Sequence, residues 1–248
     1  MLTEERHSII TETVKNRKSV SIGELCRILG VSSSTVKRDL NILAEAGMIT
    51  KVRGGAIALD ESFSAIEKNV EEKSGICTEE KTAIAAYAVT LIDNGDFVFL
   101  DAGTTTEKMI DFLPQKNVTF VTNGFIHAKK LAQRGFRVFI TGGEIKASTE
   151  AIVGAECVLT LKNYNFTKCF MGVNGVSLSA GYTTPDVNEA KVKAAAIESS
   201  RKAYVLADHS KFDEISAATF AQLSRASMIT DRLKNRKYAE YTTVKEVM

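Results

Sequence analysis

The fold of this chain is constrained most by a regular alternation of short apolar runs with longer amphipathic patterns, which begins at Thr78. The apolar runs predict strands at residues 97–100, 118–121, 137–140, 168–171, 203–206 and 228–229. The longer patterns predict a helix capped by Thr78 and further helices near residues 105–112, 125–134, 154–161 and 186–200. Strands that alternate with helices in this way form a mostly parallel sheet covered on both faces. The later part of the chain is therefore predicted to be an α/β domain.

The first 59 residues follow a different pattern, in which helices precede a hairpin. The helices are predicted at residues 3–17, at 21–29 and from Ser32 or Ser33 to about residue 46. Gly47 is expected to end the third helix as its C-cap. Residues 48–59 then form two strands around an Arg-Gly-Gly turn. This order of elements predicts a winged helix-turn-helix.

Residues 60–77 lie between these two parts, and their charge and weak periodicity are typical of a linker or a weakly packed helix. The acidic start is not a signal peptide, and no apolar stretch approaches the ~18 residues of a membrane span. We therefore expect a cytoplasmic protein that has no membrane partner. The four cysteines (Cys26, Cys77, Cys157 and Cys169) are scattered and form no C-x-x-C pair, which predicts neither disulfides nor a metal site.

The third helix is predicted to read DNA. Its apolar stripe faces inward, and its opposite face carries Ser34, Lys37, Arg38 and Asn41. The two cations can contact phosphates or guanine edges, and the amide can pair with an adenine edge. Lys51 and Arg53 are placed at the tip of the wing. A merely solvated helix face is the alternative, but the preceding turn and the following hairpin favour double-stranded DNA as the partner.

Polar and glycine clusters follow the predicted strands directly. They converge on one crevice, because the carboxyl ends of parallel strands meet at the same edge of a sheet. Helix N-terminal amides and threonine hydroxyls suit a phosphate, a lysine adds charge, and Asp and Asn groups suit sugar hydroxyls. The candidates for this effector site are Asp101, Gly103, Thr104, Thr105, Thr106, Thr122, Asn123, Gly142, Gly143, Asn174 and Lys211. Neither Gly-x-Gly-x-x-Gly nor Gly-x-x-x-x-Gly-Lys-Ser/Thr is present, so we expect a small phosphorylated sugar and no dinucleotide or other cofactor.

Two runs in the first part, 31–40 and 47–56, resemble the DNA-binding signature of the DeoR family of bacterial repressors. Ser33 and Thr35 belong to the first run and complete the predicted DNA-contacting set. Lys37 stands where the family more often has Arg, and Arg53 where it often has His. A lysine is a point charge rather than a bidentate fork, so the operator sequence cannot be copied from relatives.

The strand-end clusters resemble the sensor domain of the same family in their order, and this resemblance adds Glu189 to the effector site. It implies a sugar-phosphate-isomerase-like α/β fold and a homo-oligomeric repressor, a dimer or tetramer, that a phosphorylated sugar releases from its operator. The expected segments are then a DNA-binding domain in residues 1–59, a linker in 60–77 and a sensor domain in 78–248. The runs 1–7 and 180–186 are most similar to the fructose operon repressor subgroup, which implies fructose 1-phosphate as the effector.

Two other functions remain as alternatives. The first is an enzyme, because ribose-5-phosphate isomerase shares the implied fold; its base would be Asp101, Asp208 or Glu189, with Lys211 as partner. However, Asn174 stands where an acid would be needed, and an amide cannot abstract a proton, so we expect no catalytic residues. The second is a DNA-binding protein whose second domain only oligomerises, with the polar clusters serving as caps and turns.

Overall fold

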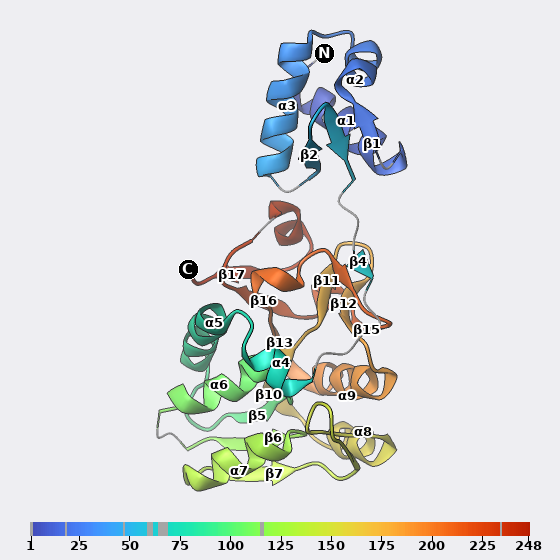
Figure 1. Cartoon of the computed structure of the whole chain (residues 1–248). Coiled ribbons are helices and arrows are strands. Elements are labelled where there is room, and N and C mark those ends of the chain that lie inside the picture. The colour runs from blue at the N-terminus through green and yellow to red at the C-terminus, as the bar shows by residue number, and fades with distance from the viewer. Residues whose placement is uncertain are drawn as a thin grey trace. The chain divides into compact units, whose positions relative to one another are not determined.

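The chain is represented by a computed structural model that describes residues 2–17, 19–46, 48–58, 62–63, 69–114, 117–233 and 235–248 (Figure 1). It divides into two compact units. The first takes in Met1–Glu61 and Lys234–Arg236, and the second takes in Ser62–Leu233 and Lys237–Met248. Among the described residues, no helix combines the length and the apolar character needed to cross a bilayer.

The first unit is a winged helix-turn-helix. Its elements are α1 (Thr3–Arg17), β1 (Ser19–Ser21), α2 (Ile22–Leu29), α3 (Ser33–Glu45), β2 (Thr50–Val52) and β3 (Gly55–Ile57). The three helices pack on one apolar cluster that includes Ile10, Leu25 and Leu40. The Ser32 hydroxyl caps α3 by accepting a hydrogen bond from the Thr35 amide at 3.3 Å, as the sequence predicts. The predicted C-cap, Gly47, lies outside the described residues.

The hairpin of β2 and β3 is the predicted wing, and the structure adds a third strand to it. β1 pairs antiparallel with β3, so that the sheet order is β1-β3-β2. A three-residue strand offers too few positions to show a period of two, so the sequence pattern did not reveal it. Gly54 turns the wing with φ +96°, a backbone conformation that side chains with a Cβ rarely adopt.

The second unit is built on a seven-stranded sheet in which every pair of neighbouring strands is parallel. The strand order is β17-β16-β13-β10-β5-β6-β7. Their bounds are β5 (Phe97–Leu100), β6 (Thr119–Thr122), β7 (Arg137–Ile140), β10 (Phe166–Gly172), β13 (Ser200–Leu206), β16 (Ser227–Thr230) and β17 (Val244–Glu246). The chain runs from β5 to β6 and β7 in one direction and from β10 to β13, β16 and β17 in the other, so the order reverses between β5 and β10.

Helices cover both faces of this sheet (Figure 1). One face carries α5 (Thr78–Thr90), α6 (Thr104–Phe112) and α7 (Phe125–Gln133), and the other carries α8 (Ala155–Lys162) and α9 (Val187–Glu198). Alternate residues of a strand point to opposite faces, so Val98 and Leu100 belong to the first core and Phe99 to the second. These α/β features confirm the fold class that the sequence predicts.

Shorter elements complete the second unit. They are the hairpin of β8 (Glu144–Lys146) and β9 (Ala151–Val153), the small sheet of β11 (Gly175–Ser177), β12 (Gly181–Thr184) and β15 (Ala218–Ala221), and the 3-10 turns η1 (His209–Lys211), η2 (Leu223–Arg225) and η3 (Arg236–Glu240). None of them follows from the apolar pattern, because each spans four residues or fewer or has no regular period.

The sequence predicts a linker over residues 60–77, but the described part of that segment belongs to the second unit. β4 (Ser62–Phe63) pairs in parallel with β14 (Glu214–Ile215). α4 (Val70–Ser74) begins at a capping box formed by Asn69 and Glu72. The described helix α4 agrees with the second of the two expected forms, a weakly packed helix, since charge alone does not distinguish a linker from a short surface helix.

Candidate functional site

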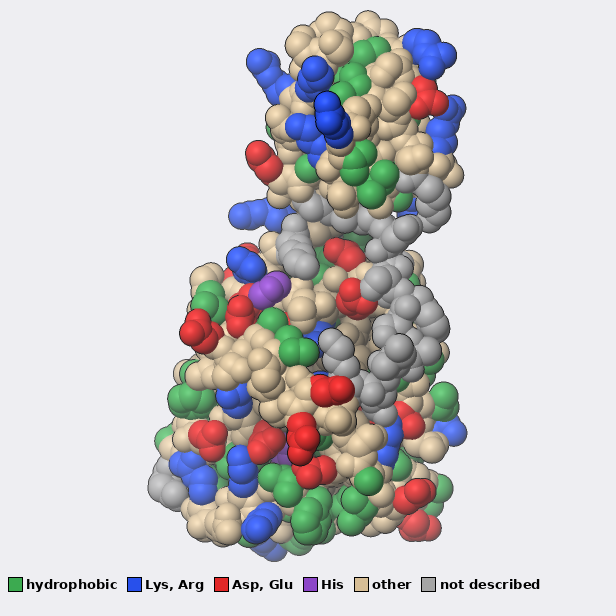
Figure 2. Space-filling view, viewed as in Figure 1, with side chains coloured by type: hydrophobic (Ala, Val, Ile, Leu, Met, Phe, Trp, Pro, Cys, Tyr) green, Lys and Arg blue, Asp and Glu red, His purple; other side chains and the backbone are tan. Residues whose placement is uncertain are grey.

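The polar face of α3 is exposed, as the sequence predicts. Five of the six predicted contact residues on this helix are exposed and Thr35 is half-buried; the exposed ones are Ser33, Ser34, Lys37, Arg38 and Asn41. Figure 2 shows Lys and Arg side chains over the visible part of α3. The opposite stripe, with Val36, Leu40 and Leu43, is fully buried in the core of the unit. This division seats the helix on one side and leaves a polar side that fits a DNA groove.

Asp39 fixes α3 against α1. Its carboxylate is 1% exposed and accepts hydrogen bonds from Arg6 Nε at 2.7 Å, Arg6 Nη2 at 3.0 Å and His7 Nε2 at 3.1 Å. The Arg6 guanidinium, followed by the effect of His7, holds the pKa of Asp39 below its usual value against the effect of burial. The orientation of the recognition helix therefore depends on this charged contact as well as on apolar packing.

Lys51 and Arg53 are exposed on the wing. Lys51 Nζ donates a hydrogen bond to Asn41 Oδ1 at 2.6 Å, which joins the wing to the recognition helix. The sequence predicts both residues as DNA contacts but not this link between them. An incoming adenine edge would have to compete with Lys51 for the Asn41 amide oxygen.

The second unit contains a polar cleft at the carboxyl ends of β5, β10 and β13, where the strand order reverses. Ligands in open α/β sheets bind at such a point. The cleft encloses about 630 Å³ of empty space, including the part open to solvent. Its lining residues are Val70, Lys73, Lys81, Ala102, Gly103, Thr104, Thr105, Thr149, Gly172, Val173, Asn174, Glu189, Lys193, Leu206, Asp208 and Lys211.

The N-terminus of α6 opens into this cleft. Gly103 is its N-cap, and no side chain caps the first turn. The hydroxyls of Thr104 and Thr105 have no hydrogen-bond partner among the described residues, whereas Thr106 Oγ1 donates to the carbonyl oxygen of Asp101 at 2.6 Å. Free amides, free hydroxyls and the positive end of the helix dipole together suit an anion.

His127 contacts the first turn of α6 from its buried side. It is 5% exposed, and its Nε2 lies 3.4 Å from the Gly103 amide and 3.2 Å from Thr106 Oγ1. Burial lowers the pKa of His127 to about 4, so the imidazole is neutral at pH 7. A neutral imidazole can accept the hydrogen bond that the Gly103 amide donates.

Lysines converge on the cleft from four different elements, α4, α5, α9 and η1. Lys81 of α5 is 2% exposed and donates to the carbonyl oxygen of Lys73, and burial lowers its pKa. Lys193 of α9 is 4% exposed and pairs with Asp101. Lys211 of η1 is half-buried and has no ion pair within the described part of the chain. This concentration of positive charge favours an anionic ligand.

Asp208 supplies an acceptor of opposite charge in the same cleft. Its side chain is buried, Oδ1 accepts a hydrogen bond from the Ser210 amide at 3.0 Å, and Oδ2 has no hydrogen-bond partner in the part of the chain that the structure describes. Burial raises the pKa of Asp208, but Lys211, Ser210 and Lys81 outweigh it and hold that pKa below its usual value. Since buried polar atoms are nearly always paired, Oδ2 is available to a ligand donor such as a hydroxyl.

Glu189 and Asn174 form the other polar wall. Glu189 Oε1 accepts hydrogen bonds from Thr149 Oγ1 at 2.7 Å and from Lys146 Nζ at 3.2 Å. Thr184 Oγ1 lies 3.1 Å from Asn174 Oδ1 and 3.3 Å from Glu189 Oε2. Burial raises the pKa of Glu189, yet Lys193, Thr149 and Lys146 together hold it below its usual value. The Glu189 carboxylate is therefore ionised, and its hydrogen bonds hold it in a fixed position.

Six of the residues predicted for the effector site line the cleft: Gly103, Thr104, Thr105, Asn174, Glu189 and Lys211. Four others lie behind the lining and support it. Asp101 pairs with Lys193, Thr106 bonds to the Asp101 carbonyl, Thr122 Oγ1 accepts from the Gly124 amide at 3.0 Å, and Asn123 Oδ1 accepts from the Ala102 amide at 2.9 Å. These residues shape the loops instead of facing a ligand.

Gly142 and Gly143 are the exceptions, because they are exposed and do not line the cleft. Gly143 has φ +134°, and a Cβ there would lie 2.3 Å from the Val153 carbonyl oxygen. The glycine is thus explained by the close approach of β8 and β9, which a strand-end glycine pair in the sequence does not distinguish from a ligand loop.

The sequence prediction left out five polar lining residues, Lys73, Lys81, Thr149, Lys193 and Asp208. Asp208 could have been predicted from the sequence, because it lies in the polar cluster that follows the predicted strand 203–206. Lys73 and Lys81 had none, because a single lysine in a helix is indistinguishable from a solvated one until the packing is known.

A winged helix joined to an α/β unit with a polar cleft defines the class of two-domain transcriptional regulators, and comparisons with known proteins specify the family. Residues 6–62 match the DeoR-like helix-turn-helix domain, and residues 76–232 match the DeoR C terminal sensor domain. The chain therefore belongs to the DeoR family of transcriptional regulators, the family that its motifs resemble.

Two curated relatives extend over almost the whole chain. A protein of Bacillus subtilis (strain 168), named "Uncharacterized HTH-type transcriptional regulator FruR", is 42% identical over 100% of this chain and 99% of its own length. The lactose phosphotransferase system repressor of Staphylococcus epidermidis is 35% identical over 97% of this chain and 98% of its own length. Because such relatives are named as regulators and repressors, the expectation that the chain is not an enzyme is confirmed.

Among solved structures, ribose 5-phosphate isomerase A from Methanocaldococcus jannaschii aligns with 54% of this chain and 54% of its own, at 17% identity and a TM-score of 0.41. A likeness at this level carries no functional argument.

Proposed function

We propose that this protein is a transcriptional repressor of a sugar-utilisation operon, and that a phosphorylated sugar in the cleft releases it from its operator. One observation carries the proposal. A single cleft combines a helix N-terminus without a side-chain cap, converging lysines and a buried carboxylate oxygen that has no hydrogen-bond partner among the described residues. A ligand with both a phosphate and hydroxyl donors satisfies all three features at once.

The two ends of such a ligand meet different groups. The phosphate binds at the first turn of α6, to the amides and hydroxyls of Thr104 and Thr105, with Lys81 and Lys211 balancing its charge. The sugar hydroxyls donate to Asp208 and are placed by Asn174 and Glu189. Asp101, Thr106, Thr122 and Asn123 act by holding the loops, and Gly142 and Gly143 have no part in this assignment.

The α3 face and the wing bind double-stranded operator DNA. The contacting residues in this proposal are Ser33, Ser34, Thr35, Lys37, Arg38, Asn41, Lys51 and Arg53. Paired half-sites require at least two reading heads, so the repressor acts as a homo-oligomer, a dimer or tetramer. We place it in the cytoplasm, where operator DNA and phosphorylated sugars are both present.

For the effector we propose fructose 1-phosphate. Support comes from the similarity of residues 1–7 and 180–186 to the fructose operon repressor subgroup. The polar walls of the cleft suit any small sugar phosphate, so the choice within that class rests on this similarity alone.

Isothermal titration calorimetry on the full-length protein tests the effector site. Fructose 1-phosphate is expected to bind the wild type, and Lys211→Ala to lower the affinity at least tenfold, because it removes an ammonium from a partly desolvated phosphate site. Lys162→Ala, an exposed lysine of α8, is the matched control and should bind normally. If no sugar phosphate binds the wild type, the second unit has no role as a sensor and only the oligomerising function is left for it.

A further inference from the structure

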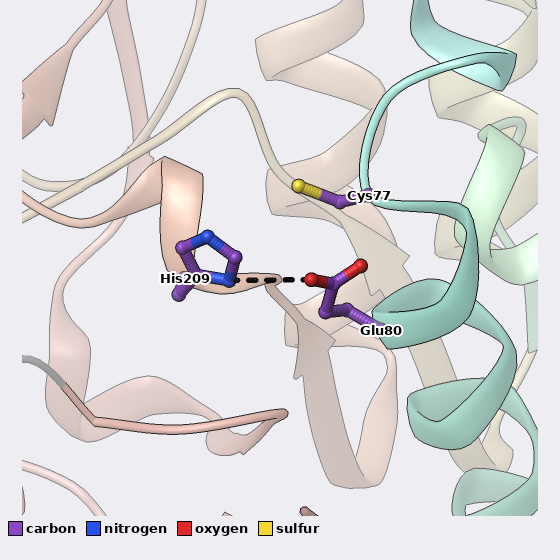
Figure 3. A group of neighbouring side chains, drawn as sticks. All are labelled: Cys77, Glu80 and His209. Atoms are coloured by element: carbon purple, nitrogen blue, oxygen red, sulfur yellow. Dashed lines mark ion pairs between the residues drawn. The ribbon is translucent and has the colours of Figure 1, made fainter.

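Three metal-ligating side chains meet beside the cleft without lining it. One ligand atom each from Cys77, Glu80 and His209 lies within 4.8 Å of the other two, and all three residues are half-buried (Figure 3). Cys77 and Glu80 are the N-cap and third residue of α5, so they share one face of its first turn. His209 comes from η1, in a distant part of the sequence.

The donor set selects a class of metal. A thiolate sulfur, an imidazole nitrogen and a carboxylate oxygen are the ligands of zinc and related transition metals, whereas magnesium and calcium prefer oxygen alone. Three protein ligands leave a fourth, tetrahedral position for water. His209 Nδ1 lies 4.0 Å from Glu80 Oε1, so small side-chain rotations bring the ligand atoms to the ~3.5 Å separations that bonds of ~2.0–2.3 Å require.

The imidazole of His209 is already held in position. Asp231 Oδ2 lies 2.7 Å from His209 Nδ1, and Asp231 Oδ1 accepts a hydrogen bond from the His209 amide at 2.7 Å. Asp231 is 2% exposed, so this support is rigid. Nδ1 is also the ring nitrogen that faces Glu80, so a bound metal takes the place of the Asp231 contact on Nδ1, while Asp231 keeps its hydrogen bond from the His209 amide.

The surroundings of the cluster are also negative. Carboxylate oxygens of Glu80 and Asp231 lie 4.0 Å and 2.7 Å from His209 Nδ1. A divalent metal bound there compensates this negative charge.

We propose that Cys77, Glu80 and His209 bind one divalent transition metal of the zinc class. The metal joins the first turn of α5 to η1, and these two elements also carry Lys81 and Lys211 of the cleft. It therefore fixes the spacing of the two elements. The site is independent of the proposed effector, because it is formed by residues outside the cleft lining and is measured with the metal alone.

Cobalt(II) spectroscopy on the untagged, reduced, full-length protein tests this site. Titration should give one equivalent of bound cobalt, with a thiolate-to-cobalt charge-transfer band in the near ultraviolet and visible bands typical of tetrahedral coordination. Zinc should displace the cobalt. Cys77→Ser should abolish the charge-transfer band, and His209→Gln should lower the affinity at least tenfold. Cys26→Ser, which removes the half-buried thiol of the first unit, should leave the spectrum unchanged.

Thermal unfolding separates loss of the site from loss of the fold. Each variant should show a cooperative transition close to that of the metal-free wild type, while zinc should raise the Tm of the wild type and of Cys26→Ser but not of Cys77→Ser. The proposal is overturned if the wild type binds no stoichiometric cobalt. It is equally overturned if the charge-transfer band persists in Cys77→Ser.

Discussion

Lys193 and Asp101 form an ion pair beneath the cleft in which the lysine side chain is 5% exposed and the carboxylate 1%. Asp101 Oδ2 also accepts a hydrogen bond from the Gly172 amide at 2.9 Å, and Lys193 Nζ donates to the Gly172 carbonyl at 3.2 Å. The pair thus joins the ends of β5 and β10 to α9, on either side of the point where the strand order reverses. It holds the loops that form the cleft.

Lys193→Met should destabilise the second unit by about 3–5 kcal/mol, because it leaves the Asp101 carboxylate buried without a counter-charge. The double variant Lys193→Met with Asp101→Asn should recover part of that loss. Denaturant unfolding followed by circular dichroism measures both. A single variant within 1 kcal/mol of wild type would show that the pair does not support the cleft.

Asp208→Asn should lower fructose 1-phosphate affinity about 10- to 100-fold, since a hydrogen bond to a charged acceptor contributes roughly 1.5–3 kcal/mol. The amide keeps an Oδ1 acceptor for Ser210, so the loop should remain folded. Calorimetry on this variant and on Asp111→Asn, an exposed carboxylate of α6, makes the comparison. Equal affinities in the two variants would remove Asp208 from the effector site.

Arg38→Ala should weaken operator binding at least tenfold and reduce the slope of log affinity against log salt by about 1, because one phosphate contact is lost. Effector affinity should not change. Lys15→Ala, an exposed lysine near the end of α1, serves as the control for general loss of positive charge. An identical effect in both variants would mean that the recognition face has been placed wrongly.

Acid should destabilise the second unit through His127. Its pKa is lowered by burial to about 4 in the folded chain, while the unfolded value is 6.5, so the unfolded state binds the extra proton as the pH falls from 6.5 toward 4. Stability is therefore full above 6.5 and falls by up to about 3 kcal/mol across this window. His127→Gln should flatten that loss in unfolding experiments at pH 7 and pH 5. If the free energy of unfolding of His127→Gln falls between pH 7 and pH 5 as much as that of the wild type, His127 is not the source of the acid destabilisation.

Local pattern was sufficient to predict the main framework from the sequence. The strands 97–100 and 137–140 occur at those positions, because each is a short apolar run; the first is buried in the middle of the sheet, and the second is its half-exposed edge strand. The exposed face of α3 and the first turn of α6 were also predictable, since both depend on residues that are neighbours in the chain.

Features that depend on tertiary packing were not predictable. Lys81 and Lys211 lie far apart in the sequence, and only the docking of α5 against η1 brings them to one cleft. The cluster of Cys77 and His209 has the same origin, and no ligand spacing in the sequence indicates it. Conversely, Gly143 follows a predicted strand as a ligand-loop glycine would, but the structure explains it by the close approach of β8 and β9.

The central claim is that a sugar phosphate in the cleft controls DNA binding, and fluorescence anisotropy tests it most directly. The full-length protein is titrated into a labelled duplex from upstream of its own gene, at fixed salt, with and without fructose 1-phosphate. The expected result is a 5- to 150-fold rise in the Kd for DNA, as for a coupling of about 1–3 kcal/mol, and for Asp208→Asn the same rise only at about 10- to 100-fold higher fructose 1-phosphate. Tight DNA binding that neither fructose 1-phosphate nor any other sugar phosphate alters would contradict the account.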